Sequence, residues 1–302
     1  MGSPFDLADA AAYRAWRDAK LASYPRTVDE LVVPLANPRQ LAPAERDALA
    51  ARCARANMAI YSAPHLPAAD KSLALALGRQ LGLARLEGNY LADEDGLSSI
   101  TPNEDETHVR GDYIPYTHKP INWHTDGYYN TPERRILGMT LHCAQDAEAG
   151  GENTLLDHEI AYIQLRDVNP DYVAALMHPA AMTIPPRLGE DGVARAEQSG
   201  PVFAVDPDAG FLAMRYTART RSIVWRDDAT TRAAVKTLSD ILADSEYVLT
   251  ARLAPGMGLV CNNVLHTRNG FSDSPGRRRL LYRGRYYDRL RFDPSPAAAS
   301  VV

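Results

Sequence analysis

The stretch Asn122-Trp123-His124-Thr125-Asp126-Gly127 contains a His-x-Asp triplet. Alternate side chains of an extended strand share a face, so the His124 imidazole and the Asp126 carboxylate are predicted to point the same way. A second imidazole, His266, lies just past an apolar run at residues 258–263 that reads as a short strand. Two imidazoles and one carboxylate are the ligand set of a mononuclear non-haem Fe(II) centre with open coordination positions. The bare triplet is more often an ordinary hydrogen-bonded histidine, so the prediction depends on further signals.

Arginines fill most odd positions between residues 277 and 291, whereas the even positions are mostly apolar. If this segment is one strand, it has a cationic and an apolar face, which suits a barrel wall beside a polar cavity. The planar guanidinium of Arg279 is predicted to hold the far carboxylate of a 2-oxo diacid that chelates the metal through its other end. Arg277 lies on the same face and is the rival for that role. Arg285 to Arg291 are expected to be solvated.

Four stretches of the chain together resemble the taurine dioxygenase (TauD/TfdA-like) family of Fe(II)/2-oxoglutarate-dependent oxygenases. They are residues 122–127, Gly150-Gly151-Glu152-Asn153-Thr154, Asn262-Asn263-Val264-Leu265-His266, and Arg278-Arg279-Leu280-Leu281-Tyr282-Arg283. These stretches span the central and C-terminal parts of the chain. The first 85 or so residues contain no motif that matches the family.

The resemblance implies a role for each matching residue. The iron ligands would be His124, Asp126 and His266. Thr154 would donate a hydrogen bond to the 2-oxoglutarate carboxylate, and Arg279 would pair with its distal carboxylate. Arg283 would lie nearby and touch either the cosubstrate or an anionic group of the substrate. This chain has Glu152-Asn153 where the family usually has a single Asp.

The resemblance also implies the reaction. With Fe(II), 2-oxoglutarate and O2, the protein would hydroxylate a small polar substrate and release succinate and CO2. Halogenases of this class have a small residue in place of the carboxylate ligand, so Asp126 favours hydroxylation. The arginines favour an anionic substrate such as a sulfonate, sulfate ester or carboxylate. Candidate substrate-side residues are Asn122, Tyr128, Tyr129 and Arg283.

Three alternatives stay open. Within the class, the substrate could be an amino acid or a natural product. A non-redox, cupin-like metal-binding jelly roll would keep the histidine and aspartate ligands without needing Arg279. A binding module that has lost catalysis would keep the fold without iron.

Asn263 is interpreted either as capping a turn or as orienting a metal ligand through a hydrogen bond.

The order of predicted elements favours a mainly β protein with flanking helices, a double-stranded β-helix (jelly-roll) barrel. Helices are predicted over residues 6–22, 43–57, 70–84, 158–178 (with a break near Asn169-Pro170) and 229–244. Strands are predicted over residues 135–145, 202–206, 211–216, 246–253, 258–263 and 277–289. Residues 179–200 have no clear period and read as a lid or binding loop. All 302 residues are expected to form one oxygenase domain, with a helical part at about 1–85, the jelly roll at about 86–292 and a disordered tail at about 293–302.

Composition limits the partners. The chain is 45% hydrophobic and 24% charged, which is ordinary for a soluble globular enzyme. The net charge of -5 argues against nucleic acid as a partner. No apolar run is long enough for a membrane span, and the start lacks a signal-peptide pattern. Three widely spaced cysteines imply no disulfide framework, so a cytoplasmic location is expected. A small-molecule substrate is the expected partner, and a homo-oligomer is left open.

Overall fold

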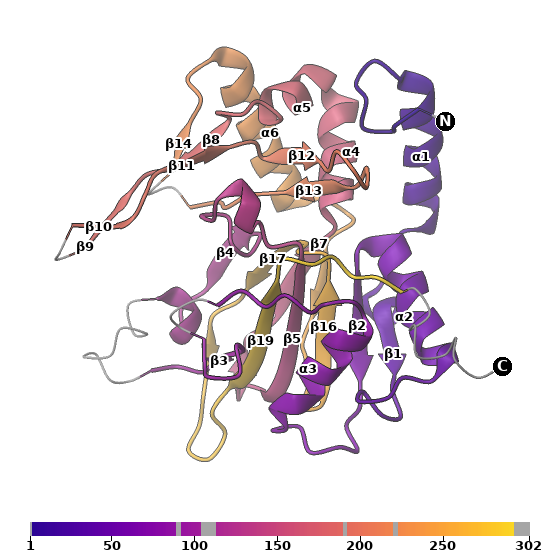
Figure 1. The fold of residues 1–302 in the computed structure, drawn as a ribbon, viewed down its shortest axis with the longest axis vertical. Coiled ribbons are helices and arrows are strands. Elements are labelled where there is room, and N and C mark those ends of the chain that lie inside the picture. Colours follow the sequence, from indigo (N-terminus) through magenta and orange to yellow (C-terminus); the bar gives the residue numbers. More distant parts are fainter. Residues whose placement is uncertain (1, 89–91, 104–112, 190–191, 220–222, 293–302) are drawn as a thin grey trace.

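Two β-sheets, one of six and one of four strands, form the centre of the molecule (Figure 1). The structure is a computed structural model that describes residues 2–88, 92–103, 113–189, 192–219 and 223–292. In spatial order, the larger sheet contains β1 (Val32–Pro34), β2 (Met58–Ser62), β16 (Met257–Cys261), β5 (Gly138–Gln145), β19 (Leu280–Tyr286) and β3 (Ser98–Ile100). The smaller sheet contains β15 (Leu249–Ala251), β7 (Asn153–Leu156), β17 (Leu265–Arg268) and β4 (Ile121–His124).

The larger sheet is buried on both faces near its middle. In β5 every residue except the last is buried, because one face borders the interior between the sheets and helix α3 (Lys71–Gln80) packs on the other. Burial on both faces explains why this strand reads as a continuous apolar run instead of an alternating one. Asp70 caps α3 by accepting a hydrogen bond from the backbone of Ser72.

Strand β19 has the two faces that the arginine pattern predicts, but it is shorter than expected. Arg279, Leu281 and Arg283 line a cavity between the sheets. Tyr282 and Tyr286 join apolar clusters that contain residues of α3 on the opposite face.

The prediction that Arg285 to Arg291 form a solvated face is wrong for two of its arginines. Arg285 is only 6% exposed and pairs with Glu87, 2.5 Å away. Arg289 is half-buried and stacks over Phe211. Both side chains have partners from segments distant in the sequence, which a strand pattern cannot reveal.

A helical layer and several short strands pack beside the smaller sheet (Figure 1). Helices α4 (His158–Val168) and α5 (Pro170–Leu176) replace the predicted helix over 158–178, and the break lies at Asn169 as expected. The other helices are α1 (Ala10–Ser23), α2 (Pro43–Ala56) and α6 (Ala229–Asp244). Helix α1 begins later than predicted because the side chain of Asp9 caps its first turn.

Residues 179–200 contain four short strands, so the structureless loop expected there is wrong. They are β8 (Met182–Ile184), β9 (Arg187–Gly189), β10 (Gly192–Arg195) and β11 (Gln198–Gly200). The remaining short strands are β6 (Ala149–Gly150), β12 (Phe203–Val205), β13 (Leu212–Met214), β14 (Val224–Trp225) and β18 (Phe271–Ser272). In Figure 1 the β9–β10 hairpin projects from the helical layer on the side where β4 lies.

A buried polar cluster ties the N-terminal helix to the layer of α4. The Lys20 ammonium lies 2.7 Å from Asp157 and 2.5 Å from Glu159. Asp157 also accepts a hydrogen bond from the Asn57 side chain at 3.0 Å. Buried charges need such partners, since an unpaired one loses its hydration without compensation.

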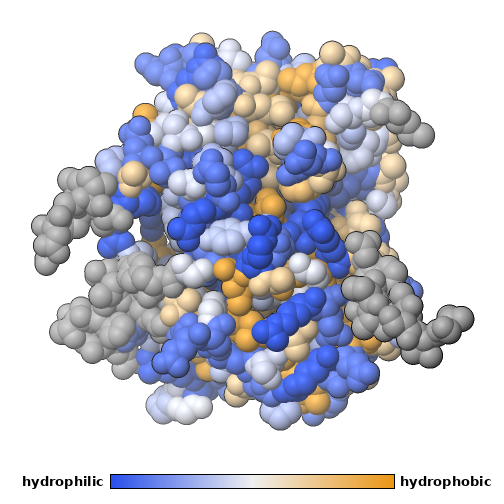
Figure 2. All heavy atoms as spheres, in the orientation of Figure 1, coloured by the Kyte–Doolittle hydropathy of each residue, from blue (hydrophilic) through white to orange (hydrophobic). Residues whose placement is uncertain are grey.

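One large apolar cluster runs from Phe5 to Leu281 and includes residues of both sheets and of the helical layer. Figure 2 shows the molecular surface from the direction of Figure 1. This surface is mostly hydrophilic, with apolar residues exposed near its middle. None of the described helices combines the length and apolarity needed to cross a membrane. The single-domain organisation stays a prediction, and the tail predicted as disordered lies outside the described residues.

Candidate metal centre and cosubstrate cavity

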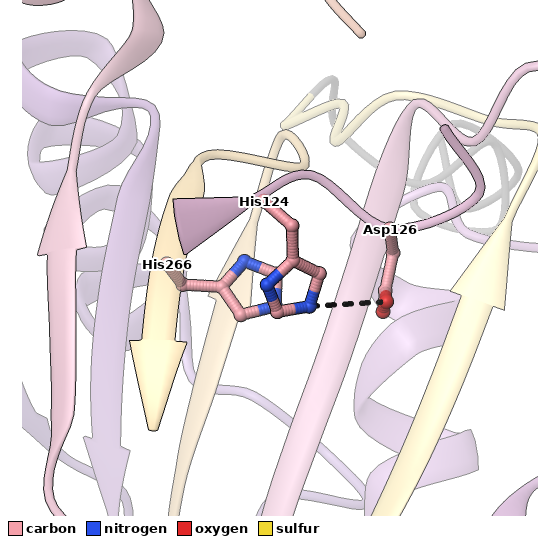
Figure 3. A group of neighbouring side chains, drawn as sticks. All are labelled: His124, Asp126 and His266. Carbon is pink, nitrogen blue, oxygen red and sulfur yellow. Dashed lines mark ion pairs between the residues drawn. The ribbon is translucent and has the colours of Figure 1, made fainter. Parts of the chain in front are cut away.

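The structure brings His124, Asp126 and His266 together (Figure 3). Strands β4 and β17 are antiparallel, and His124 lies directly opposite His266 in their register. The two imidazole centroids are 4.2 Å apart, and His124 Nε2 lies 3.9 Å from Asp126 Oδ1. One ligand atom from each of the three residues lies within 4.8 Å of the others. Such spacing suits three ligands on one side of a single metal ion.

The main chain orients both imidazoles. His124 Nδ1 lies 2.9 Å from the carbonyl oxygen of Asn122, and His266 Nδ1 lies 2.9 Å from that of Val264. Because a carbonyl only accepts, Nδ1 carries the proton and Nε2 keeps its lone pair for a metal. Burial lowers the pKa of His124 to about 3, with the neighbouring His266 adding to the effect, and burial also lowers the pKa of His266. Both rings are therefore neutral at pH 7, the form that binds metals.

Asn263 fixes the turn that carries Asp126. Its side chain accepts from the Asp126 N–H at 2.8 Å and donates to the Asp126 carbonyl at 3.0 Å. It also donates to the Ile136 carbonyl at 2.8 Å. Asn263 adopts a φ of 51°, in the left-handed region that asparagine tolerates better than most residues. The two interpretations of Asn263 are thus compatible. Asn263 lies at a turn, and its side chain also holds the backbone of Asp126.

The Asp126 carboxylate is ionised and has a free oxygen. Burial opposes its charge, but Arg283 and Arg285 outweigh burial and hold the pKa of Asp126 well below its usual range. Arg283 lies 3.1 Å from Oδ1, whereas Oδ2 is buried without a hydrogen-bond partner among the described residues. A charged, partly unsatisfied carboxylate beside two neutral imidazoles fits an Fe(II) ion.

A cavity lies between the sheets beside the two histidines. Met139, Leu141 and Leu281 supply apolar wall, and Arg279 and Arg283 supply positive charge. Arg279 is 5% exposed, its guanidinium lies 4.9 Å from the centroid of the Phe271 ring, and no described carboxylate forms an ion pair with it. Burial lowers the pKa of Arg279 only to about 10, so it stays cationic at pH 7.

The rival Arg277 lies elsewhere. It is at the surface, where it pairs with Asp146 at 2.7 Å and with Glu148 at 3.5 Å. It does not line the cavity, whereas Arg279 does. The geometry therefore favours Arg279 for an anion in the cavity.

Asn153, and not Thr154, lines the cavity. Neighbouring residues of β7 point to opposite faces, so only one of the two can face the interior between the sheets. Asn153 Nδ2 donates to the Thr267 carbonyl at 2.9 Å. The extra residue in Gly150-Gly151-Glu152-Asn153-Thr154 was the sequence signal for this shift.

Sequence reasoning missed Arg268. Its guanidinium is buried on the cavity wall and donates to backbone carbonyls of the segment that precedes β4. These carbonyls belong to Ile114, Pro115, Thr117 and Lys119. Arg268 lies two residues after His266 on the same strand, and that period could have predicted a shared face.

The candidate substrate-side residues differ in placement. The Tyr129 hydroxyl accepts from Arg285 at 2.8 Å, and the Tyr128 ring contacts the Tyr129 ring edge-on at 5.2 Å. Asn122 is exposed and contributes its carbonyl to His124. Tyr129 thus contacts Arg285, whose charge acts on Asp126, and Arg285 is a neighbour that the sequence did not indicate.

The model of the Taurine catabolism dioxygenase TauD, TfdA family matches residues 20–285. The chain belongs to this family. A uridine-5'-phosphate dioxygenase from Amycolatopsis sp is 35% identical to this TauD/TfdA protein over 179 residues, 56% of this chain and 62% of the relative. A uridine-5'-phosphate dioxygenase from Streptomyces sp is 29% identical over 201 residues, 63% of this chain and 69% of the relative. The chain thus spans less than two thirds of the length of the Amycolatopsis relative.

Solved structures of TauD-like oxygenases share the fold. An asparagine oxygenase in complex with Fe(II), 2S,3S-3-hydroxyasparagine and succinate gives a TM-score of 0.57 at 17% identity, over 95% of this chain and 86% of the other. The non-heme iron oxygenase OrfP in complex with Fe, succinate and (3R,4R)-dihydroxy-L-Arg gives 0.60 at 17% identity, over 82% of each chain. The predicted jelly-roll fold of this TauD/TfdA protein is confirmed.

Proposed function

We propose that this family member is an Fe(II)- and 2-oxoglutarate-dependent dioxygenase that oxidises a small anionic molecule. The observation that carries the proposal is the convergence of His124, Asp126 and His266 beside a cavity that contains Arg279. A cupin-like protein without redox chemistry would have no use for a buried arginine in that cavity. A module that has lost catalysis would not need all three metal ligands.

The three ligand residues would hold iron through both Nε2 atoms and the Asp126 carboxylate. Bound there, Fe(II) would supply the redox chemistry of the reaction. O2 would oxidise 2-oxoglutarate to succinate and CO2, and this oxidation would be coupled to oxidation of the substrate. Arg279 would hold the distal carboxylate of 2-oxoglutarate as a fork, and the Asn153 amide would replace Thr154 as the polar group on the wall. The apolar wall would keep water away from the reacting groups.

The first substrate candidate is a nucleoside 5'-monophosphate, with uridine 5'-phosphate as the reference compound. The sequence relatives from Amycolatopsis and Streptomyces, both uridine-5'-phosphate dioxygenases, support it. It also agrees with the anionic substrate expected from the arginines, although the expected anions were a sulfonate, sulfate ester or carboxylate. The amino-acid alternative has support only from likeness of fold. A cytoplasmic location and the oligomeric state stay predictions.

The test is spectroscopic. Anaerobic addition of Fe(II) and 2-oxoglutarate should produce the visible metal-to-ligand charge-transfer band of this enzyme class. His124→Ala and Asp126→Ala should abolish the band, whereas the matched control His65→Ala should retain it because His65 is exposed and distant. Succinate release with uridine 5'-phosphate, uridine and amino acids would then rank the substrates. An unchanged band in both ligand variants would refute the proposal.

A further inference from the structure

Two arginines face each other on the β9–β10 hairpin. In the antiparallel register, Arg195 of β10 lies opposite Arg187 of β9. Like charges directly opposite each other destabilise a pair of strands. A third arginine, Arg219, lies near Arg195. The charges of Arg187 and Arg219 both lower the pKa of Arg195. Arg187 lies opposite Arg195 in the hairpin, and Arg219 follows Ala218, whose N–H donates to the Trp123 carbonyl; these three arginines are called the cationic cluster.

Aromatic groups, and not carboxylates, accompany this cluster. The Arg195 guanidinium lies 5.6 Å from the Tyr129 ring centroid, and that of Arg187 lies 5.0 Å from the Tyr113 ring centroid. Arg195 donates to the Pro185 carbonyl at 2.8 Å, while its Nε is buried without a hydrogen-bond partner. Within the described parts of the chain, none of the three arginines forms an ion pair with an acidic residue. Among the described residues, therefore, no carboxylate neutralises the positive charge of this cluster.

The cluster borders the metal centre. Thr217 forms a β-bridge with His124, and the Ala218 N–H donates to the Trp123 carbonyl at 2.8 Å, so Arg219 follows a segment held against β4. The Thr217 hydroxyl also interacts with the Tyr128 hydroxyl. An anion bound by the arginines would lie near the tyrosines that follow the carboxylate ligand.

We propose that Arg187, Arg195 and Arg219 bind the phosphate monoester of the substrate. This inference rests on the proposed function, whose substrate class it narrows. A phosphate monoester carries a charge of about -1.5 to -2 at pH 7 and offers three acceptor oxygens, which matches three guanidinium forks better than a carboxylate does. The rest of the substrate would extend past Tyr128 and Tyr129 toward the metal centre.

Calorimetry tests the proposal with two probes that differ only by the phosphate. The full chain, loaded anaerobically with Fe(II) and 2-oxoglutarate, is titrated with uridine 5'-phosphate and with uridine. The nucleotide should bind at least about tenfold more tightly than the nucleoside, since a hydrogen bond to a charged group is worth about a factor of ten or more. Arg195→Gln should remove most of this difference and leave uridine binding unchanged.

Two further variants make the result specific. Arg219→Gln alters an exposed member of the cluster and should reduce the nucleotide preference even if Arg195→Gln does not fold. Arg232→Gln, at an exposed arginine on α6, should keep the full preference. Added salt should reduce the preference as well, because exposed charges are screened.

The outcomes separate this inference from the proposed function. Equal affinity for nucleotide and nucleoside, including no binding of either, overturns the phosphate site. So does a preference that survives in both Arg195→Gln and Arg219→Gln. If the charge-transfer band forms while the preference is absent, only the phosphate site fails. If the band never forms, the iron assignment fails, and the same titrations of the metal-free chain still decide the phosphate site.

Discussion

Arg283 donates to the carboxylate of Asp126 across 3.1 Å, so a candidate metal ligand from the turn after β4 is ion-paired to a strand of the opposite sheet. The two side chains are 12% and 5% exposed, which places this pair out of bulk water. The contact joins the two sheets at the metal centre. It also helps to keep the Asp126 carboxylate charged.

Arg283→Met should destabilise the metal-free protein by about 2 kcal/mol, because a buried carboxylate loses a charged hydrogen-bond donor. Urea unfolding at pH 7 measures the change. Asp126→Asn alone and the double variant complete a mutant cycle in which the two losses should not add. Strictly additive losses would show that the contact contributes nothing.

Asn263→Ala should weaken Fe(II) binding by about tenfold or more, because groups that orient a metal ligand have effects of this size. The substitution removes both hydrogen bonds to the backbone of Asp126. Titration of Fe(II) with the charge-transfer band gives the affinity. Asn263→Gly keeps the left-handed backbone conformation accessible, so comparable losses in both variants would assign the effect to the missing amide.

Arg279→Gln should weaken 2-oxoglutarate binding by about tenfold or more, because a bidentate charge-assisted contact is lost. The concentration of 2-oxoglutarate that half-saturates the band is the measurement. Arg277→Gln is the matched control, since that arginine lies two residues away at the surface and pairs with Asp146. If Arg277→Gln shows the larger effect, the assignment to Arg279 is wrong.

Asn153→Ala should weaken 2-oxoglutarate binding more than Thr154→Val does. Of these two residues, only Asn153 lines the cavity. Thr154→Val should therefore change the free energy of 2-oxoglutarate binding by no more than about 0.5 kcal/mol, as for other residues away from a site. The same titration compares the two variants. The reverse order would restore the threonine contact that the sequence resemblance implies.

Lys20→Met should destabilise the protein by about 3 kcal/mol at pH 7, because it leaves the buried Asp157 without its cation. Urea unfolding at several pH values is the measurement. The surface variant Lys236→Met, which breaks an exposed pair with Asp240, should cost less than about 1 kcal/mol.

The loss in Lys20→Met should also depend on pH. Burial opposes the charge on both groups, but their contact lowers the pKa of Asp157 and raises that of Lys20. The carboxylate contribution is present above the unfolded-state pKa of about 3.9 and disappears as the pH falls through the lower folded-state value. The lysine contribution is present below about 10.4 and disappears as the pH rises through its higher folded-state value. A deficit that is constant between pH 3 and pH 7 would contradict this account.

The sequence predicted the elements and the convergence of His124, Asp126 and His266 better than it predicted the polar contacts. Periodicity was enough for α6 and for the break at Asn169, because capping and apolar spacing are local. It could not place the partners of Arg285 and Arg289, since these come from Glu87 and Phe211, far away in the sequence. At Asn153 and Thr154 the structure adds which of two neighbouring strand residues faces the cavity, while the cosubstrate contact of either stays a prediction.

Each imidazole of the metal centre is oriented by a main-chain carbonyl two residues before it. A main-chain acceptor survives every side-chain replacement at Asn122 or Val264. The backbone of β4 and of the turn before β17 therefore fixes which nitrogen of each ring carries the proton, so substitutions on the substrate side can accumulate without changing the tautomer of either candidate ligand.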